Sequence, residues 1–449
     1  MDDKMHARRL GRRDFLKVAG LTGISLSGAR LLAACAPAPT AAPTAMAGTS
    51  QIGGSLTATY MASGTYDAAA KDLIAAFEAK YGTKVTVAAF PWMGLVGNNA
   101  KDLITGAGNY DVMSGAGANL WAFLEPLDPY IQRDGYEEPF VPGLLDKMPH
   151  FQGALLGLPY GCDSYGMAIR TDLFEEAGIK VPQEAWTWDE FDKNVAELHA
   201  KFKDRGISGF VLAGGAVDQL GPFFWGRYDG YHWSKDGALK HDEALSVAAL
   251  ERLKLEFQYC PTNVLGLSID EANAVFLAGN ACVLECWPSF IRGVLDDPNQ
   301  SKIAGKWAFM PYPTPGFDYL SVWPLVINKA SKNKEAAWQW LKAYVSREAD
   351  KTFFEKYGFG LAMTSTYEDP GLKAKHSGDF PASLANLSRA KQPVVPDEAE
   401  FFLGQVVSEA VNGTTSFKDA IAKLNEKWAS IQGAQPEYEL AVTEGLVQK

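Results

Sequence analysis

The sequence predicts a protein of the α/β class, because segments with the spacing of a strand alternate along it with segments that have the spacing of a helix. Leu56, Ala58 and Tyr60 alternate as in a strand, residues 73–81 place apolar side chains at helical intervals, and residues 85–89 alternate again. Gly82 is predicted to end the helix, because a helix C-terminus favours a residue that can adopt a left-handed backbone. A strand, a helix and a second strand in this order predict a parallel sheet.

A second unit of the same kind follows, with a helical stretch around residues 99–105 and then the strand "YDVMSGAG". Ser114 and Gly115 close that strand, and small residues at the carboxyl end of a parallel strand let the backbone approach a ligand. The stretch "GAGANL" lacks the third glycine of a dinucleotide fingerprint, which argues against that class of site.

Later elements carry local signals of their own. Thr187 and Glu190 form a predicted capping box for a helix that runs to about residue 202. The stretch "ACVLECW" reads as a strand, and Ser331 and Ser346 are predicted caps of two helices. Within or beside these helices, the tryptophans Trp188, Trp338 and Trp340 are predicted to lie in the core.

The N-terminus predicts export. Arg12 and Arg13 begin "RRDFLK", which resembles a twin-arginine signal. The apolar stretch 18–34 is too short and too interrupted by glycine to span a bilayer. "LAAC" resembles a lipobox that ends at Cys35. We therefore expect residues 1–34 to be a signal peptide that is removed, Cys35 to be lipidated, and residues 35–54 to form a tether rich in Pro, Ala and Thr.

Charge and cysteine content narrow the function. Without residues 1–34 the chain holds 35 basic and 50 acidic residues, which argues against nucleic acid or an anionic membrane surface as a partner. Cys282 and Cys286 are too far apart along one strand to pair, so either one of them pairs with Cys162 or Cys260, or the thiols are free. Scattered histidines and cysteines fit no zinc pattern, and no metal or cofactor is predicted.

Three longer stretches carry a resemblance to a known family. They are "PYGCDSYGMAIRTDLFEEAGI" followed by "TWDEF", then "FLAGNACVLECWPSF", and then "WPLVINKASKNKEAAWQWLKAYVS". In this order they resemble the extracellular solute-binding proteins of ABC importers (family 1), in the sugar-carrying, maltose-binding-protein-like branch, over about residues 52–430.

The resemblance implies a two-lobed, periplasmic-binding-protein-like fold of type II. The chain would cross its hinge three times, near residues 159–163, 313–317 and 358–363. Lobe one would hold residues 55–159 and 318–360, and lobe two would hold residues 160–317 and 361–449.

A sugar site needs flat rings to cover the C–H faces of the ligand and polar groups to bind its hydroxyls. The candidate residues are Tyr60, Trp92, Ser114, Gly115, Asp163, Trp225, Tyr228, Trp287, Trp323 and Phe401. The resemblance favours Trp287 as a stacking surface and Asp163 as an acceptor of hydroxyl hydrogen bonds. For each tryptophan a place in the core or on ordinary surface is the alternative, and Asp163 could instead cap the hinge. Asp218 and Asp229 are weaker candidates.

The implied function is that of a membrane-tethered, extracytoplasmic binding protein with no catalytic activity. It would capture a sugar by lobe closure and deliver it to an ABC permease that is driven by a cytoplasmic ATPase. A carrier of a polyol, polyamine or other small solute is one alternative. A secreted glycan hydrolase is another, with Asp163 and either Asp218 or Asp229 as its carboxylate pair. No G-x-S-x-G motif follows residue 35 to support a serine hydrolase.

Overall fold

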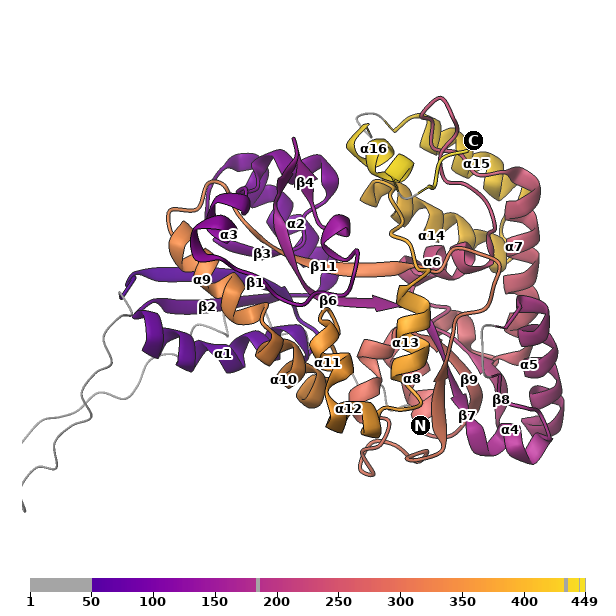
Figure 1. Ribbon diagram of the computed structural model, residues 1–449. Helices are drawn as coiled ribbons and strands as arrows, with labels where there is room; N and C mark the ends of the chain where they lie inside the picture. Colours follow the sequence, from indigo (N-terminus) through magenta and orange to yellow (C-terminus); the bar gives the residue numbers. More distant parts are fainter. Residues whose placement is uncertain (1–50, 183–185, 432–434, 444, 449) are drawn as a thin grey trace, which may run out of the picture. The chain divides into compact units, whose positions relative to one another are not determined.

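A computed structural model describes residues 51–182, 186–431, 435–443 and 445–448 (Figure 1). The predictions for Arg12, Arg13 and Cys35, and with them most of the predicted tether, lie outside the described residues. Residues 49–449 form one compact unit, and the description that follows concerns this unit alone.

The first of two large sheets has the strand order β2–β1–β3–β11–β6. Its strands are β1 (Ser55–Met61), β2 (Lys84–Phe90), β3 (Val112–Ser114), β6 (Gly157–Ser164) and β11 (Leu320–Ile327). β1 pairs in parallel with β2 and β3, as the strand–helix–strand pattern predicts, and β11 pairs antiparallel with β3 and β6.

Helices cover both faces of this sheet (Figure 1). They are α1 (Tyr66–Tyr81), α2 (Trp92–Thr105), α3 (Asp128–Asp134), α9 (Lys334–Tyr344) and α10 (Arg347–Tyr357). α1 and α9 pack against each other on one face, and α2 contributes Leu103 to a separate apolar cluster on the other. α1 ends as predicted, because Gly82 has a left-handed backbone with φ of 68°.

The second sheet has the order β10–β7–β9–β8. Its strands are β7 (Gly166–Arg170), β8 (Ser208–Val211), β9 (Ala281–Cys286) and β10 (Trp307–Met310). The helices of this half are α4 (Thr171–Ala177), α5 (Trp188–Phe202), α6 (Val217–Arg227), α7 (Glu243–Glu256), α8 (Ile269–Leu277), α13 (Phe380–Leu387), α14 (Asp397–Val411), α15 (Phe417–Ala429) and α16 (Gln435–Thr443). The two sheets with their own helices confirm the predicted two-lobed α/β class.

Short segments join the two sheets. β6 ends at Ser164 and β7 begins at Gly166, while the return runs from Met310 at the end of β10 to Leu320 at the start of β11. Beyond α10 the chain forms α11 (Thr364–Glu368) and α12 (Pro370–Lys375) and then α13, which packs against β6, β7 and β10. The lobe boundary predicted at residues 159 and 160 falls inside β6, whose whole length belongs to the first sheet. A small hairpin, β4 (His150–Phe151) and β5 (Ala154–Leu155), precedes β6.

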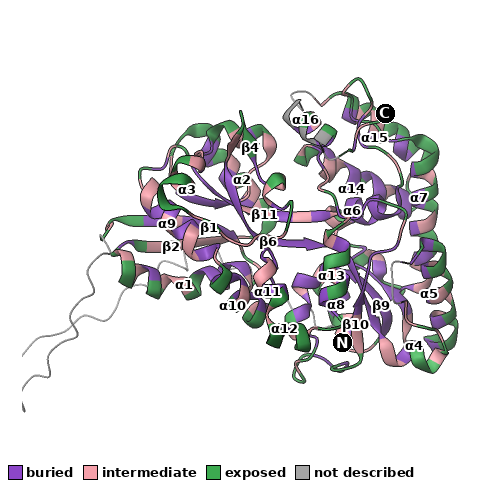
Figure 2. Cartoon of the chain, viewed as in Figure 1, coloured by how far each residue is buried: buried purple, intermediate pink, exposed green. Residues whose placement is uncertain are grey.

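Buried residues gather along both sheets (Figure 2). Trp188, Trp338 and Trp340 are in these cores, as predicted. The four cysteines of the described residues are free and buried, so the disulfide considered for Cys162 or Cys260 is absent. Among the described residues no helix is both long enough and apolar enough to span a membrane.

Two of the three predicted caps are confirmed. Thr187 and Glu190 form a reciprocal capping box at the start of α5, and the Ser346 hydroxyl accepts a hydrogen bond from the backbone N–H of Ala349 at 3.2 Å. The prediction for Ser331 is wrong, because α9 begins only at Lys334. The Ser331 hydroxyl instead donates to Asp111 at 2.6 Å, which ties the loop before α9 to the loop before β3.

Candidate functional site: a cleft between the two sheets

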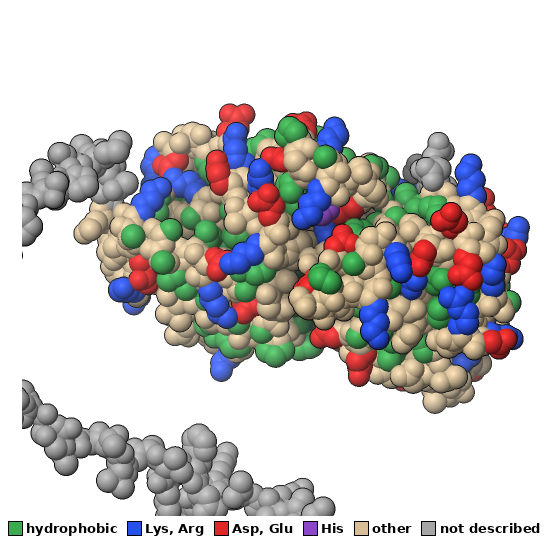
Figure 3. Space-filling view, turned by 90° about the horizontal axis from the view of Figure 1, so that it is seen from below, with side chains coloured by type: hydrophobic (Ala, Val, Ile, Leu, Met, Phe, Trp, Pro, Cys, Tyr) green, Lys and Arg blue, Asp and Glu red, His purple; other side chains and the backbone are tan. Residues whose placement is uncertain are grey.

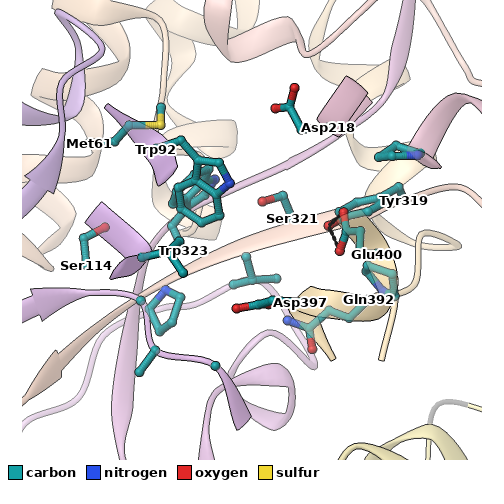
Figure 4. A pocket seen from close by; sticks show the side chains of 18 of the residues that line it. Met61, Trp92, Ser114, Asp218, Tyr319, Ser321, Trp323, Gln392, Asp397 and Glu400 are labelled. Carbon is teal, nitrogen blue, oxygen red and sulfur yellow. Dashed lines mark hydrogen bonds between the residues drawn. The ribbon is translucent and has the colours of Figure 1, made fainter. Parts of the chain in front are cut away.

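A cavity of about 790 Å³ is lined by residues from both halves of the compact unit (Figure 4). One wall comes from the ends of β1 and β3, the start of α2 and the middle of β11. The other comes from α6, α8, the turn after β9, and the start of α14. This volume lies in the range of sites that enclose small organic ligands.

Aromatic rings form one side of the cavity. Trp92, the first residue of α2, meets Trp323 of β11 edge to face, with ring centroids 5.4 Å apart. Tyr66 lies behind Trp323 at 5.1 Å. Trp92 is 37% exposed, and Figure 4 shows the two indoles together beside open space. The pair therefore offers an apolar surface of the kind that packs against the C–H face of a sugar ring.

Trp287 also lines the cavity, directly after β9, where the resemblance places it. Its indole Nε1–H donates to Gln219 Oε1 at 2.8 Å, and Tyr165 covers one of its faces with ring centroids 4.1 Å apart. Only 9% of Trp287 is exposed. Trp287 therefore offers less exposed surface to a ligand than Trp92 or Trp323, which are more exposed.

The opposite side of the cavity is polar. The Tyr319 hydroxyl donates to both carboxylate oxygens of Glu400, at 3.0 and 3.3 Å, and Asp218, Asp397 and Gln392 lie around this pair (Figure 4). Burial within the cleft, reinforced by the charges of Asp397 and Asp218 and opposed by the Tyr319 hydrogen bond, raises the pKa of Glu400 to about 8. These groups can accept hydrogen bonds from hydroxyl or ammonium donors.

Asp163 lies on the cavity wall at the end of β6, but its two oxygens already have partners. The backbone N–H of Ser164 donates to Oδ1 at 3.0 Å, and that of Ser289 donates to Oδ2 at 2.8 Å. Burial raises the pKa of Asp163 to about 6, although Arg292 opposes the shift. The contact with Ser289 joins the end of β6 to the turn after β9, which is the hinge-capping role that the sequence left open.

Ser114 and Gly115 line the cavity at the end of β3. The Ser114 hydroxyl is 2.6 Å from the Tyr160 hydroxyl, within a hydrogen bond in which either group can donate. Gly115 has φ of 80°, a left-handed conformation that glycine adopts without strain, and it turns the chain away from the strand. Phe401 of α14 completes the predicted residues that the cavity brings together.

Three predicted residues lie elsewhere, and we remove them from the candidate site. Tyr60 is fully buried, and its hydroxyl accepts a hydrogen bond from Trp340 Nε1 at 2.8 Å. Trp225 is fully buried and donates to His241 Nε2 at 3.3 Å. The Tyr228 ring lies 4.3 Å from the His241 ring and is 1% exposed. Each of these rings packs in the hydrophobic core of one half of the molecule. Of the weaker candidates, Asp218 lines the cavity and Asp229 does not.

Sequence reasoning missed Tyr319, Asp397, Glu400 and Gln219. A signal for two of them is present in "PDEAEFF", where a proline precedes a helix start. Asp397, Glu400 and Phe401 are spaced i, i+3 and i+4, so they share one face of α14. Tyr319 and Gln219 have no comparable local pattern. Among the described residues, no three His, Cys, Asp or Glu side chains are grouped so that they could hold a metal ion.

Comparison with known proteins assigns the family. Residues 16–351 match the family model described as bacterial extracellular solute-binding protein, which covers well over half of the chain. The chain therefore belongs to the family of bacterial extracellular solute-binding proteins, a class that acts outside the cytoplasm.

Similar proteins include sugar and polyol binders. The mannitol-binding protein of Pseudomonas aeruginosa is 26% identical over 298 residues, which are 61% of this chain and 65% of that protein. The match thus spans slightly less than two thirds of that relative. A putative binding protein of Brucella abortus is 26% identical over 317 residues, 67% of this chain and 74% of that protein.

Solved structures share the fold. A solute-binding protein of Agrobacterium radiobacter K84 in complex with ribitol superposes with a TM-score of 0.74 at 22% identity, over 85% of this chain and 99% of that one. Maltose-bound MalE3 of T. maritima gives a TM-score of 0.73 at 23% identity, over 84% and 99%. The fold is therefore the two-lobed, periplasmic-binding-protein-like fold of the MalE type.

Proposed function

We propose that the protein is the substrate-binding component of an ABC importer and that it takes one sugar or sugar alcohol into the cavity between its sheets. The observation that carries this proposal is the pairing of opposite walls, with Trp92 and Trp323 on one side and Tyr319 with Glu400 on the other (Figure 4). A polyhydroxylated solute has both an apolar face and a rim of donors, and this arrangement matches both. Relatives described as binding mannitol, ribitol and maltose support the same class of ligand.

Binding of this kind requires no chemical step. Solute hydroxyls donate to the carboxylates, while the C–H face of the solute displaces water from the indoles. A solute that contacts both walls favours the closed arrangement of the lobes over the open one by its difference in affinity for the two. The membrane permease then recognises the closed form. In this proposal the lining carboxylates are hydrogen-bond acceptors, and the solute leaves unaltered.

A calorimetric panel tests this function. Mannitol, ribitol, maltose and related sugars and polyols are titrated into the protein, and the solute is recovered afterwards by chromatography. We expect at least one solute to bind with one molecule per chain and to be recovered unchanged. Absence of binding across the panel at millimolar concentration, or release of a cleaved product, contradicts the proposal.

Two matched variants locate the binding. Trp323→Ala is expected to weaken affinity by about 1–3 kcal/mol, because it removes a large aromatic contact surface. Trp307→Ala makes the same truncation outside the cavity, at the start of β10, and is expected to leave affinity unchanged. Equal effects of the two substitutions would contradict the placement of the solute.

We also propose that the protein is exported by the twin-arginine machinery and anchored by lipid. Support comes from Arg12 and Arg13, from "LAAC" ending at Cys35, and from the Pro- and Ala-rich stretch that follows. Cys35→Ala should move the protein from the membrane fraction to the soluble extracytoplasmic fraction. Membrane association that persists in this variant would contradict the anchor.

A further inference from the structure

The walls of the cavity are acidic. Among the described residues that line it, one side chain is basic, Lys147, and six are acidic, which are Asp163, Asp218, Asp270, Asp397, Glu400 and Glu437. The outer surface differs, because on the face shown in Figure 3 Lys and Arg side chains are interspersed with Asp and Glu. Acidic side chains therefore predominate at the cavity, whereas both signs of charge are mixed on this outer face.

One of the carboxylates that line the cavity has a buried oxygen without a hydrogen-bond partner among the described residues. Glu437 of α16 is 5% exposed, and among the described residues its Oε2 has no hydrogen-bond partner. Burial and the neighbouring charge of Asp397 raise the pKa of Glu437. A buried carboxylate without a donor is costly in a folded protein, so a positive charge bound in the adjoining cavity would stabilise it.

Three more carboxylates lie near this group, because the charge of Asp397 acts on both Glu437 and Glu400, and that of Asp218 acts on Glu400. Asp218 also accepts a hydrogen bond from Gln219 Nε2 at 2.8 Å. Asp397 and Glu400 come from the first turns of α14, and Asp218 comes from the first turn of α6 (Figure 4). Asp397 is exposed to the open space of the cleft, and Asp218 and Glu400 are partly exposed. Tyr319 is the hydrogen-bond donor to Glu400, and it carries no positive charge to offset the group.

We propose that the solute is cationic: a sugar or polyol that carries a protonated amine. Its ammonium group binds among Asp218, Asp397, Glu400 and Glu437, and its hydroxylated carbon skeleton packs against Trp92 and Trp323. This proposal rests on the proposed function and narrows its substrate class.

The chemistry of the walls favours an ammonium over other ligands. A neutral hydroxyl can donate to one of these carboxylates, but it leaves the repulsion among them uncompensated. An ammonium donates up to three hydrogen bonds and also neutralises charge, and hydrogen bonds between charged partners are the stronger ones. A phosphorylated or carboxylated sugar would be repelled by the same field.

Matched pairs of compounds test the charge. Glucosamine is compared with glucose and N-acetylglucosamine, and 1-amino-1-deoxysorbitol with sorbitol, by calorimetry at pH 7 within the wider panel. We expect the tightest binder of the panel to carry an ammonium and to bind at least about tenfold more tightly than its neutral partner.

The outcomes separate the two proposals. If a neutral sugar or polyol binds as tightly as its amine counterpart or more tightly, the cationic ligand is wrong and the sugar-binding function stands. If spermidine, a polyamine without hydroxyls, binds more tightly than every hydroxylated compound, both proposals are wrong. Absence of any binding overturns both as well.

A pair of variants tests whether Glu400 binds the ammonium group. Because its pKa is raised to about 8, Glu400 is mostly protonated in the empty cleft at pH 7, and a bound ammonium favours its ionised form. Glu400→Gln keeps the shape and an acceptor for the Tyr319 hydroxyl but cannot ionise, so it should weaken the amine roughly 10- to 100-fold and its neutral partner much less. Asp229→Asn removes a carboxylate charge from an exposed position outside the cavity and should change affinity less than about twofold. Equal losses for the amine and the neutral compound in Glu400→Gln would show a merely structural role and contradict the proposal.

Discussion

His232 and His241 form a buried pair in the second half of the molecule, away from the cavity. His232 Nδ1 lies 3.0 Å from His241 Nε2, and aromatic rings of Trp225, Tyr228 and Phe317 surround them. Burial, helped by the charge of Lys391, lowers the pKa of His232 to about 3. Burial also lowers the pKa of His241. Both imidazoles are therefore neutral in the folded protein at neutral pH.

This burial makes stability depend on pH. The unfolded chain binds a proton at His232 below about pH 6.5, whereas the folded protein does not until about pH 3, so protonation favours unfolding in that window. The contribution of neutral, buried His232 to the free energy of unfolding is complete above pH 6.5. Below pH 6.5 this contribution falls by about 1.4 kcal/mol per pH unit. Burial raises the pKa values of Glu256, Asp318 and Glu400 to about 8. These carboxyl groups hold their protons more tightly in the folded protein, so their effect is opposite to that of His232: they lower stability as the pH rises.

A comparison with His232→Gln isolates the histidine. Both proteins are unfolded with urea at pH 7, 6 and 5. The free energy of unfolding of the native protein, relative to that of the variant, should fall by about 1.4 kcal/mol for each pH unit below 6.5. A difference in unfolding free energy that stays constant over this range would contradict the account.

The aromatic residues show how far sequence reasoning reaches at single positions. Trp92, Trp287 and Trp323 were predicted at the site and line the cavity, whereas Tyr60 and Trp225 were predicted by the same reasoning and lie in the cores. A tryptophan after a strand satisfies either environment, because its ring is equally suited to packing against protein or ligand. The choice depends on long-range neighbours such as Trp340 for Tyr60.

At the scale of elements, short-range signals predicted structure well. The capping box of α5 and the glycine end of α1 depend on contacts within a few residues, and both are confirmed. The prediction that Ser331 caps a helix was wrong, because its hydroxyl donates a hydrogen bond to Asp111, which is distant in the sequence. A local pattern cannot report such competition.

The start of helix α14 places acidic side chains of its first turns on the cavity wall. Pro396 precedes the first turn, and Asp397 and Glu400 then fall on the side that faces the cavity. Acidic residues in a first turn also interact favourably with the helix dipole, so these carboxylates stabilise the helix as well as forming the cavity wall. The sequence predicted only Phe401 here, because an acidic first turn is common at exposed helix starts.

At the scale of the whole molecule, the order of strands and helices and its resemblance to a family predicted the two lobes. The cavity could not be derived in the same way, since its walls combine residues from near positions 92, 218, 323 and 400. Their meeting depends on β6 and β11, which pair along the first sheet and lead directly to the second. Such non-local geometry comes from packing of the complete chain.

The most direct test of this account is a crystal structure of the protein with the tightest-binding compound of the panel. We expect one intact molecule between the two sheets, with carbon atoms against Trp92 and Trp323 and polar hydrogens directed at Glu400 and Asp218. A compound bound outside this cleft, or a cleaved product within it, would contradict the central claim.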